Sequence, residues 1–137
     1  RGLGDVYKRQ VLQRGFKPII AMELPTTNEY WLTTEVQSFE ADYKMERYYT
    51  CGCEFGLKAL FGKDKGKLMK KPWLISTTSR IIGREITRTC SHFESEHCPV
   101  SGLNTLISED YPIAMASQVH RSFHSQCIQD IHENRER

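Results

Sequence analysis

The chain has 137 residues, a length typical of one domain with a modest hydrophobic core. Its 19 basic and 17 acidic residues nearly balance, so net charge alone does not indicate nucleic-acid binding. No apolar run of about eighteen residues and no signal-peptide pattern occur, so we expect neither a membrane span nor a membrane partner. The five Cys, an odd number set among His and Lys, fit thiols or a metal site in a reducing compartment, and we expect an intracellular protein, cytoplasmic or nuclear.

Residues 1–10 (RGLGDVYKRQ) resemble a translated sequencing adapter, as expected for shotgun-assembled metagenomic DNA, and are set aside before fold reasoning. They contain three basic residues and one acidic residue, so sixteen of each sign remain in residues 11–137. We expect residues 11–132 to form the carboxyl-terminal part of one α/β domain. Residues 133–137 are expected to be a frayed, charged tail.

The first half of the chain predicts two strands with a helix between them. Residues 17–25 favour a short buried strand that ends at Pro25, because proline cannot continue a central ladder. Residues 26–28 (Thr-Thr-Asn) can cap a helix, and apolar residues then recur with helical spacing as far as Tyr43. Residues 45–51 alternate and are rich in aromatics, which predicts a second strand, closed by a turn over residues 51–56.

The second half predicts a loop, a strand and two helices. Residues 58–71 carry six lysines and two glycines, a composition typical of an exposed loop or hairpin tip. Residues 72–77 read as a third strand, and Ser79 can cap a following helix. Pro112 precedes a last helix. This order predicts an α/β layered domain with a small, partly parallel sheet.

One candidate for chemistry is Glu23, a carboxylate at the carboxyl end of the first strand. Open α/β sheets place ligands at that end of their strands, and a glutamate there can accept hydrogen bonds from a base or an amine. The alternative is a strand-ending residue with a purely structural role.

A second candidate is a metal site made from a Cys-x-Cys pair and a later Cys-x-His-x4-His-Cys segment. Zinc takes four sulfur or imidazole ligands, and two such segments can supply them when the fold brings them together. The candidate ligands are Cys51, Cys53, Cys90, His92 and His97. We expect a structural zinc held by Cys53, Cys90 and His97, with Cys51 or His92 as the fourth ligand. The alternative is buried cysteines and solvated loop histidines.

A third candidate is a basic stretch. Nine positive residues lie between Lys58 and Arg88 against two acidic ones, so the stretch carries an excess of seven positive charges. Flexible lysines and arginines on one helix face are suited to contact phosphates, and a nearby tryptophan to stack on a base. The predicted nucleic-acid-binding residues are Lys70, Lys71, Trp73, Arg80, Arg84 and Arg88.

Several short motifs occur in an order that resembles one family. They are Glu23-x-Pro25 with Trp31, Cys53-x-x-Gly56-Leu57, residues 71–78 (KPWLISTT), Cys90 with His97 and Gly102, and Tyr111-Pro112. From Val11 to about Phe123 this series resembles a family of phages, mobile elements and algal or protist genomes, which is similar to the carboxyl-terminal half of class I (cytosine-5-type) DNA methyltransferase-like domains.

The resemblance implies an incomplete Rossmann-like fold and a fragment that is inactive alone. Glu23 would be the catalytic, base-holding carboxylate, with Lys71 and the arginine face along DNA. S-adenosylmethionine would bind the full-length parent, whose missing N-terminal half would be a partner of this fragment. Two positions depart from the family pattern, since Leu24 replaces Asn and Ser95 stands where a His would fall.

The alternative function is a zinc-stabilised, non-catalytic nucleic-acid-binding module. An incomplete domain also leaves a sheet edge unpaired, so we expect poor solubility for the isolated chain.

Overall fold

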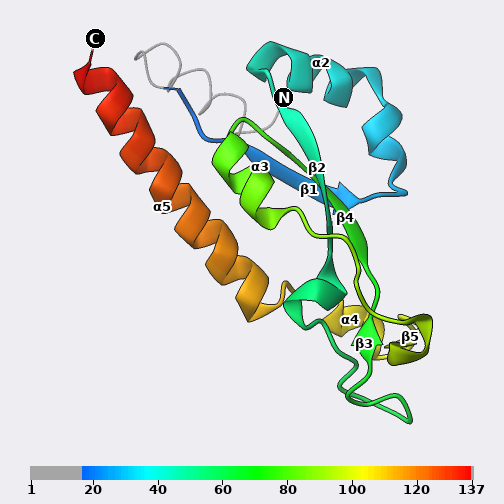
Figure 1. Cartoon of the computed structure of the whole chain (residues 1–137). Coiled ribbons are helices and arrows are strands. Elements are labelled where there is room, and N and C mark those ends of the chain that lie inside the picture. The colour runs from blue at the N-terminus through cyan, green and yellow to red at the C-terminus, as the bar shows by residue number, and fades with distance from the viewer. Residues whose placement is uncertain (1–16, 137) are drawn as a thin grey trace.

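The main sheet contains three strands, in the order β1-β4-β2. A computed structural model describes residues 17–136, so the predicted adapter lies outside the described residues (Figure 1). Strand β1 covers Ala21–Pro25, β2 covers Glu46–Cys51 and β4 covers Pro72–Thr77. Both outer strands pair antiparallel with β4, Glu23 opposite Ile75 and Tyr48 opposite the same residue from the other side.

The helices form where the sequence offers caps. Thr33 and Ser79 accept hydrogen bonds at the starts of α2 (Thr34–Tyr43) and α3 (Arg80–Ile86), and Pro112 precedes α5 (Ile113–Arg135). Shorter elements are η1 (Glu29–Leu32), η2 (Gly52–Phe55), η3 (Glu94–Glu96) and α4 (Asn104–Ile107). Strands β3 (Leu68–Met69) and β5 (His97–Cys98) form a separate parallel pair.

Helices α3 and α5 cover one face of the main sheet, and α2 lies toward the other face (Figure 1). The core lies between the sheet, α5 and the turn η2, with Trp73 and Ile75 from β4 against Phe55 and Met115. Elements η2, β3, β5 and α4 gather at one end of the sheet (Figure 1). This end carries the metal-ligating residues.

The mixed α/β class is confirmed, but the predicted sheet is wrong in one respect. The three main strands are antiparallel to their neighbours, and parallel pairing is confined to β3 and β5. Strands β1 and β2 do run in the same direction, because each is antiparallel to β4, but β4 separates them. The predicted tail is also shorter than expected, since α5 continues through residues 133–135.

Candidate metal centre

Two segments far apart in the sequence bring four ligands together. Strand β2 ends at Cys51, and η2 then turns Cys53 inward before the chain reverses at Gly56, whose φ of 82° suits glycine. After α3, the chain returns alongside β2, where the Arg88 N–H donates to the Tyr49 carbonyl at 3.3 Å. This contact brings the next segment, with Cys90 and His92, close to Cys53.

The candidate ligand atoms form a compact group, and the three distances from Cys90 suit a tetrahedral site. One atom each from Cys53, Cys90, His92 and His97 lies within 4.8 Å of all the others. Sγ of Cys90 is 3.5 Å from Sγ of Cys53, 3.5 Å from Nε2 of His97 and 3.8 Å from Nδ1 of His92. Zn–S and Zn–N bonds of about 2.3 and 2.0 Å place tetrahedral ligands about 3.3–3.8 Å apart. The Cys and His side chains therefore fit a zinc ion.

For the fourth candidate ligand, the structure favours His92 over Cys51. Cys51 lies near the cluster, with its Sγ 3.3 Å from Sγ of Cys53, but it does not belong to the group of four. Cys98 is buried in the core and also lies outside the group. Cys51 ends β2 and Cys53 lies in the following turn η2, so the two thiols are neighbours although only Cys53 joins the group of four.

Glu54 ties the two ligand-bearing segments to each other. Its Oε1 accepts hydrogen bonds from the backbone N–H of Ser91 at 2.6 Å and from Oγ of Ser91 at 2.8 Å. The same oxygen lies 3.2 Å from Nδ1 of His92. Glu54 follows Cys53 directly, so this carboxylate holds the Cys90-Ser91-His92 segment against the turn that supplies Cys53. Hydrogen bonds from Ser91 lower the pKa of Glu54, which keeps it charged.

The two thiols differ in their electrostatic surroundings. Burial, together with the adjoining Cys51 and Cys90 thiols, raises the pKa of Cys53. Burial also acts to raise the pKa of Cys90, but hydrogen bonds from His92 and Cys53 outweigh it and lower the pKa of that thiol. A bound dication would favour both thiolates, since metal charge dominates the local electrostatics.

His97 is a candidate ligand whose other ring nitrogen makes no hydrogen bond within the described residues. Its buried Nδ1 has no hydrogen-bond partner among residues 17–136, whereas metal-bound histidines usually donate their other nitrogen to an oxygen. The imidazole ring is instead positioned by edge contact with His92, the ring centroids being 5.7 Å apart. The His97 ring is therefore positioned by packing, whereas Glu54 lies against Nδ1 of His92, the nitrogen that faces Cys90.

The base-stacking role predicted for Trp73 is wrong. Its ring is only 2 % exposed and packs within the core against Gly52 and Tyr111. The role predicted for Lys71 changes for the same reason. Its ammonium donates to the carbonyl and the hydroxyl of Ser108 at 2.5 and 3.2 Å and lies over the Trp73 ring. Both residues are committed to internal contacts.

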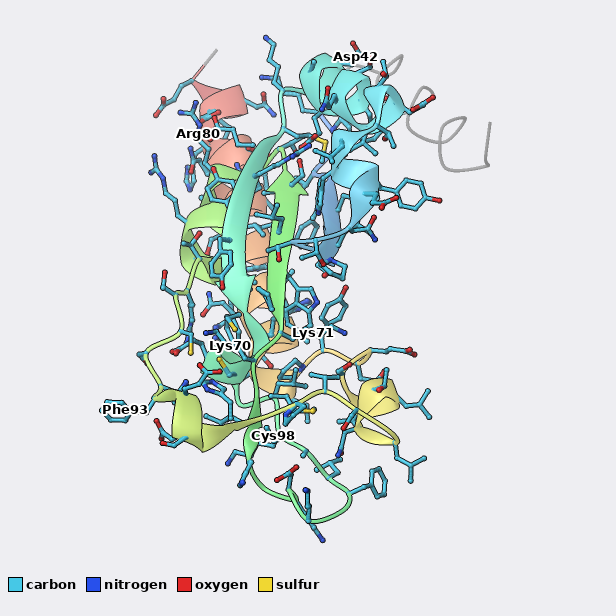
Figure 2. All side chains as sticks on the ribbon, turned by 90° about the vertical axis from the view of Figure 1, so that its right-hand side faces the viewer. Asp42, Lys70, Lys71, Arg80, Phe93 and Cys98 are labelled. Carbon is cyan, nitrogen blue, oxygen red and sulfur yellow. The ribbon has the colours of Figure 1, made fainter. Side chains whose placement is uncertain are left out.

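The other residues predicted to contact phosphate are exposed, but they lie in different parts of the molecule. They are Lys70, Arg80, Arg84 and Arg88. Arg80 and Arg84 lie on α3, and Arg80 is 3.5 Å from Glu46. Lys70 lies toward the opposite end of the molecule, beside the metal cluster, with its ammonium 3.7 Å from Glu94 (Figure 2). Arg88 covers the ring of Phe55 at 4.3 Å. Lys70 and Arg80 thus lie apart along the molecule (Figure 2).

Glu23 lies on β1 and faces α5. One carboxylate oxygen accepts a hydrogen bond from the hydroxyl of Tyr111, while the other, Oε1, is buried without a partner among residues 17–136. Burial and the Glu23 carboxylate raise the pKa of Tyr111, so its hydroxyl stays protonated and can donate. The predicted carboxylate is therefore partly satisfied inside the molecule.

Three residues with a possible role in the site were not predicted from the sequence: Glu54, Phe61 and Phe93. Glu54 clamps the metal segment, and the only local signal was its position beside Cys53. Phe61 and Phe93 are 46 % and 80 % exposed, the first on the lysine-rich loop and the second beside His92. Exposed aromatics have no periodic signal in a loop, so only the burial of neighbouring residues distinguishes them.

The fold and the site define a mixed α/β domain with a candidate Cys2His2 metal centre at one end of its sheet. Comparisons with protein-family models, with curated proteins and with solved structures give no match to this chain. Within residues 17–136, no helix has the combination of length and apolarity that crossing a membrane requires.

Proposed function

We propose that this chain is a zinc-stabilised, non-catalytic nucleic-acid-binding module. The observation that carries the proposal is the grouping of one ligand atom from each of Cys53, Cys90, His92 and His97 within 4.8 Å of the others. Four protein ligands leave no open position for water or substrate, which is the pattern of structural rather than catalytic zinc. The zinc would fasten the end of the sheet from which the lysine-rich loop extends.

The loop of residues 58–70 supports the nucleic-acid part of the proposal. Asn104 holds it in place, because its Oδ1 accepts from the N–H groups of Leu60 and Phe61 at 2.9 and 3.1 Å and its Nδ2 donates to the Phe61 carbonyl. Lys63 and Lys65 are exposed at its tip. An anchored loop with outward lysines can contact phosphates without ordering a long flexible segment.

Phe61 and Phe93 take the place of Trp73 as candidate stacking residues. Both side chains are exposed and lie near lysines. Phe61 is two residues from Lys63, and Phe93 precedes Glu94, whose carboxylate is 3.7 Å from the ammonium of Lys70. Base stacking on an aromatic ring contributes about 1–3 kcal/mol per base. Stacking would favour single-stranded over double-stranded nucleic acid.

Metal analysis tests the zinc proposal. The purified chain should retain one zinc ion per molecule in native mass spectrometry, and cobalt substitution should show thiolate absorption. Cys90→Ser and His97→Ala should each lower the affinity at least about tenfold, since a ligand is lost. Cys127→Ser, on α5, is the matched control and should bind zinc like the parent. A parent chain that takes up no zinc from metal-buffered solution would rule the site out.

Fluorescence anisotropy with labelled oligonucleotides tests the nucleic-acid proposal. The double variant Lys63→Glu/Lys65→Glu should weaken binding of a single strand and reduce its salt dependence, because phosphate contacts release counterions. Phe61→Ala should weaken single-strand binding and leave the salt dependence unchanged. Arg121→Glu/Arg135→Glu, with both exposed positions on α5, is the charge-matched control. Equal loss of binding in the control and in the loop variant would show that the loop is not the contact surface.

A methyltransferase-like parent protein is a second proposal, favoured by one observation. The buried Oε1 of Glu23, which has no hydrogen-bond partner among residues 17–136, is an acceptor that a base could use, and the donor to its other oxygen is Tyr111 of the Tyr-Pro motif. The antiparallel main sheet does not add support for a Rossmann-like fold. S-adenosylmethionine binding would belong to the parent. Restoring the upstream coding region and assaying methyl transfer with Glu23→Gln as the control tests it.

A further inference from the structure

The outer edge of β1 presents unpaired backbone groups. The Thr78 N–H donates to the Ile20 carbonyl and the Thr26 N–H to the Pro72 carbonyl, so even-numbered residues of β1 bond to β4. The N–H and C=O groups of Ala21 and Glu23 therefore point away from β4. No residue of 17–136 pairs with them, whereas the Pro25 carbonyl is taken by Nε1 of Trp31.

An apolar groove of about 460 Å³ runs beside this edge, between β1 and α5. Ile19 and Ala21 line one side, and Ala116, Val119 and Phe123 line the other. The opposite edge of the sheet differs, because the Arg88 N–H bonds to Tyr49 of β2 there. Of the two edges of the main sheet, that of β1 is the one that adjoins this apolar groove.

Helix α5 supplies one side of this groove and extends the exposed surface as far as Ile113. Residues at spacings of three and four, Ile113, Ala116 and His120 followed by Phe123, form a stripe turned away from the buried Met115 and Ser122. Ile113 is 86 % exposed and Phe123 is 44 % exposed. An open strand edge next to exposed apolar side chains is a surface that proteins normally cover.

We propose that a second copy of this chain covers this face, forming a symmetric dimer through antiparallel pairing of β1 with its copy. A twofold axis at Met22 places Ala21 opposite Glu23 of the second copy, and Glu23 opposite its Ala21. Each of these pairs exchanges two backbone hydrogen bonds, so every outward N–H and C=O of Ala21 and Glu23 finds a partner.

The charge of Glu23 and the missing N–H of Pro25 favour a twofold axis at Met22 over one at Glu23. An axis at Glu23 would set the two Glu23 side chains opposite one another, and like charges in that position destabilise a strand pair. It would also set Ala21 against Pro25, which has no N–H to donate. The axis at Met22 avoids the pair of glutamates and sets Pro25 opposite Ile19, outside the two pairs that exchange hydrogen bonds. Since that axis is perpendicular to the sheet, both α5 helices lie on the same face, where the two grooves adjoin.

The test combines molecular mass with backbone hydrogen exchange on the full chain. Light scattering after gel filtration should give a dimer, and the amides of Ala21 and Glu23 should exchange slowly at high concentration and faster on dilution. Ala21→Pro removes an outward N–H that β4 does not use and should raise the dimer dissociation constant at least about tenfold. Ala21→Val retains the N–H and serves as its matched control.

Phe123→Glu should also dissociate the dimer, and Leu106→Glu, an equally exposed apolar site on α4, should not. Circular dichroism and zinc content verify that each variant is folded. A parent chain that is monomeric at all concentrations would overturn the proposal. So would a dimer that survives Ala21→Pro, or protection of Ala21 and Glu23 that does not change on dilution. The last result would mean that a segment of the same chain covers the edge.

Discussion

Gly83 lies in the middle of α3, against the aromatic ring of Tyr48 on β2. A Cβ at this position would be only 2.1 Å from Cε2 of Tyr48. In a seven-residue helix, glycine costs backbone entropy and is on propensity alone a poor choice. The structure gives the reason for it, because only a residue without a side chain lets α3 lie directly on the sheet.

We expect Gly83→Ala to destabilise the protein by about 1–3 kcal/mol, the usual cost of overpacking, although alanine favours isolated helices. Urea unfolding followed by tryptophan fluorescence measures this change. A double-mutant cycle with Tyr48→Ala should recover at least about 1 kcal/mol as coupling energy, since the clash is removed. Additive losses in the cycle would show that Tyr48 is not the cause.

At the scale of elements, α2 is held to the sheet by a polar network rather than by an apolar face. Arg47 of β2 donates from Nε and Nη2 to both oxygens of Glu40 on α2, at 2.8 and 2.5 Å. The Ser76 hydroxyl donates to Glu40 at 2.7 Å, and Arg47 also lies over the Trp31 ring. These contacts satisfy a carboxylate that is only 8 % exposed.

The hydrogen bonds from Arg47 lower the pKa of Glu40 in the folded protein. A lowered folded pKa contributes stability that is complete above the ordinary pKa of 4.5 and disappears as the pH falls through the folded value. We expect Glu40→Gln to cost about 2 kcal/mol near neutral pH, between the values for exposed and buried ion pairs. Its unfolding free energy should approach that of the parent in acid. An equal deficit at pH 7 and at low pH would contradict this assignment.

Across the whole molecule, the two ends rely on different sources of stability. The main sheet with α3 and α5 buries Trp73, Ile75 and Ile82. At the other end, β3 and β5 contribute only two residues each. Such a short strand pair is marginal by itself, so the proposed zinc would supply much of the order there.

Removing zinc with a chelator should therefore loosen one end of the molecule first. We expect faster hydrogen exchange in residues 88–98 and in β3, while β4 and α5 stay protected, together with a lower unfolding temperature. Glu54→Gln should partly mimic this loss by freeing Ser91, with zinc affinity reduced about 10–100-fold. Uniform exchange changes across the chain would show that the metal stabilises both ends alike.

Much of the local structure could be predicted because it depends on neighbouring residues. Proline and glycine, the caps Ser79 and Pro112, and the alternation in residues 45–51 act within a few positions, and the strand predicted at residues 72–77 has those bounds. The grouping of the candidate ligands Cys53, Cys90 and His97 was also predictable, since two short Cys- and His-bearing segments can together supply a zinc site.

Tertiary structure decided what depends on residues that are distant in sequence. The antiparallel pairing arises because β4 lies between β1 and β2. Residues 72–77 alone do not specify which strands will pair with β4. The choice of His92 over Cys51, the burial of Trp73 and the need for Gly83 each depend on a side chain that another segment brings into contact. Short-range patterns limit the conformation of a segment, whereas packing determines which of its side chains remain available for binding.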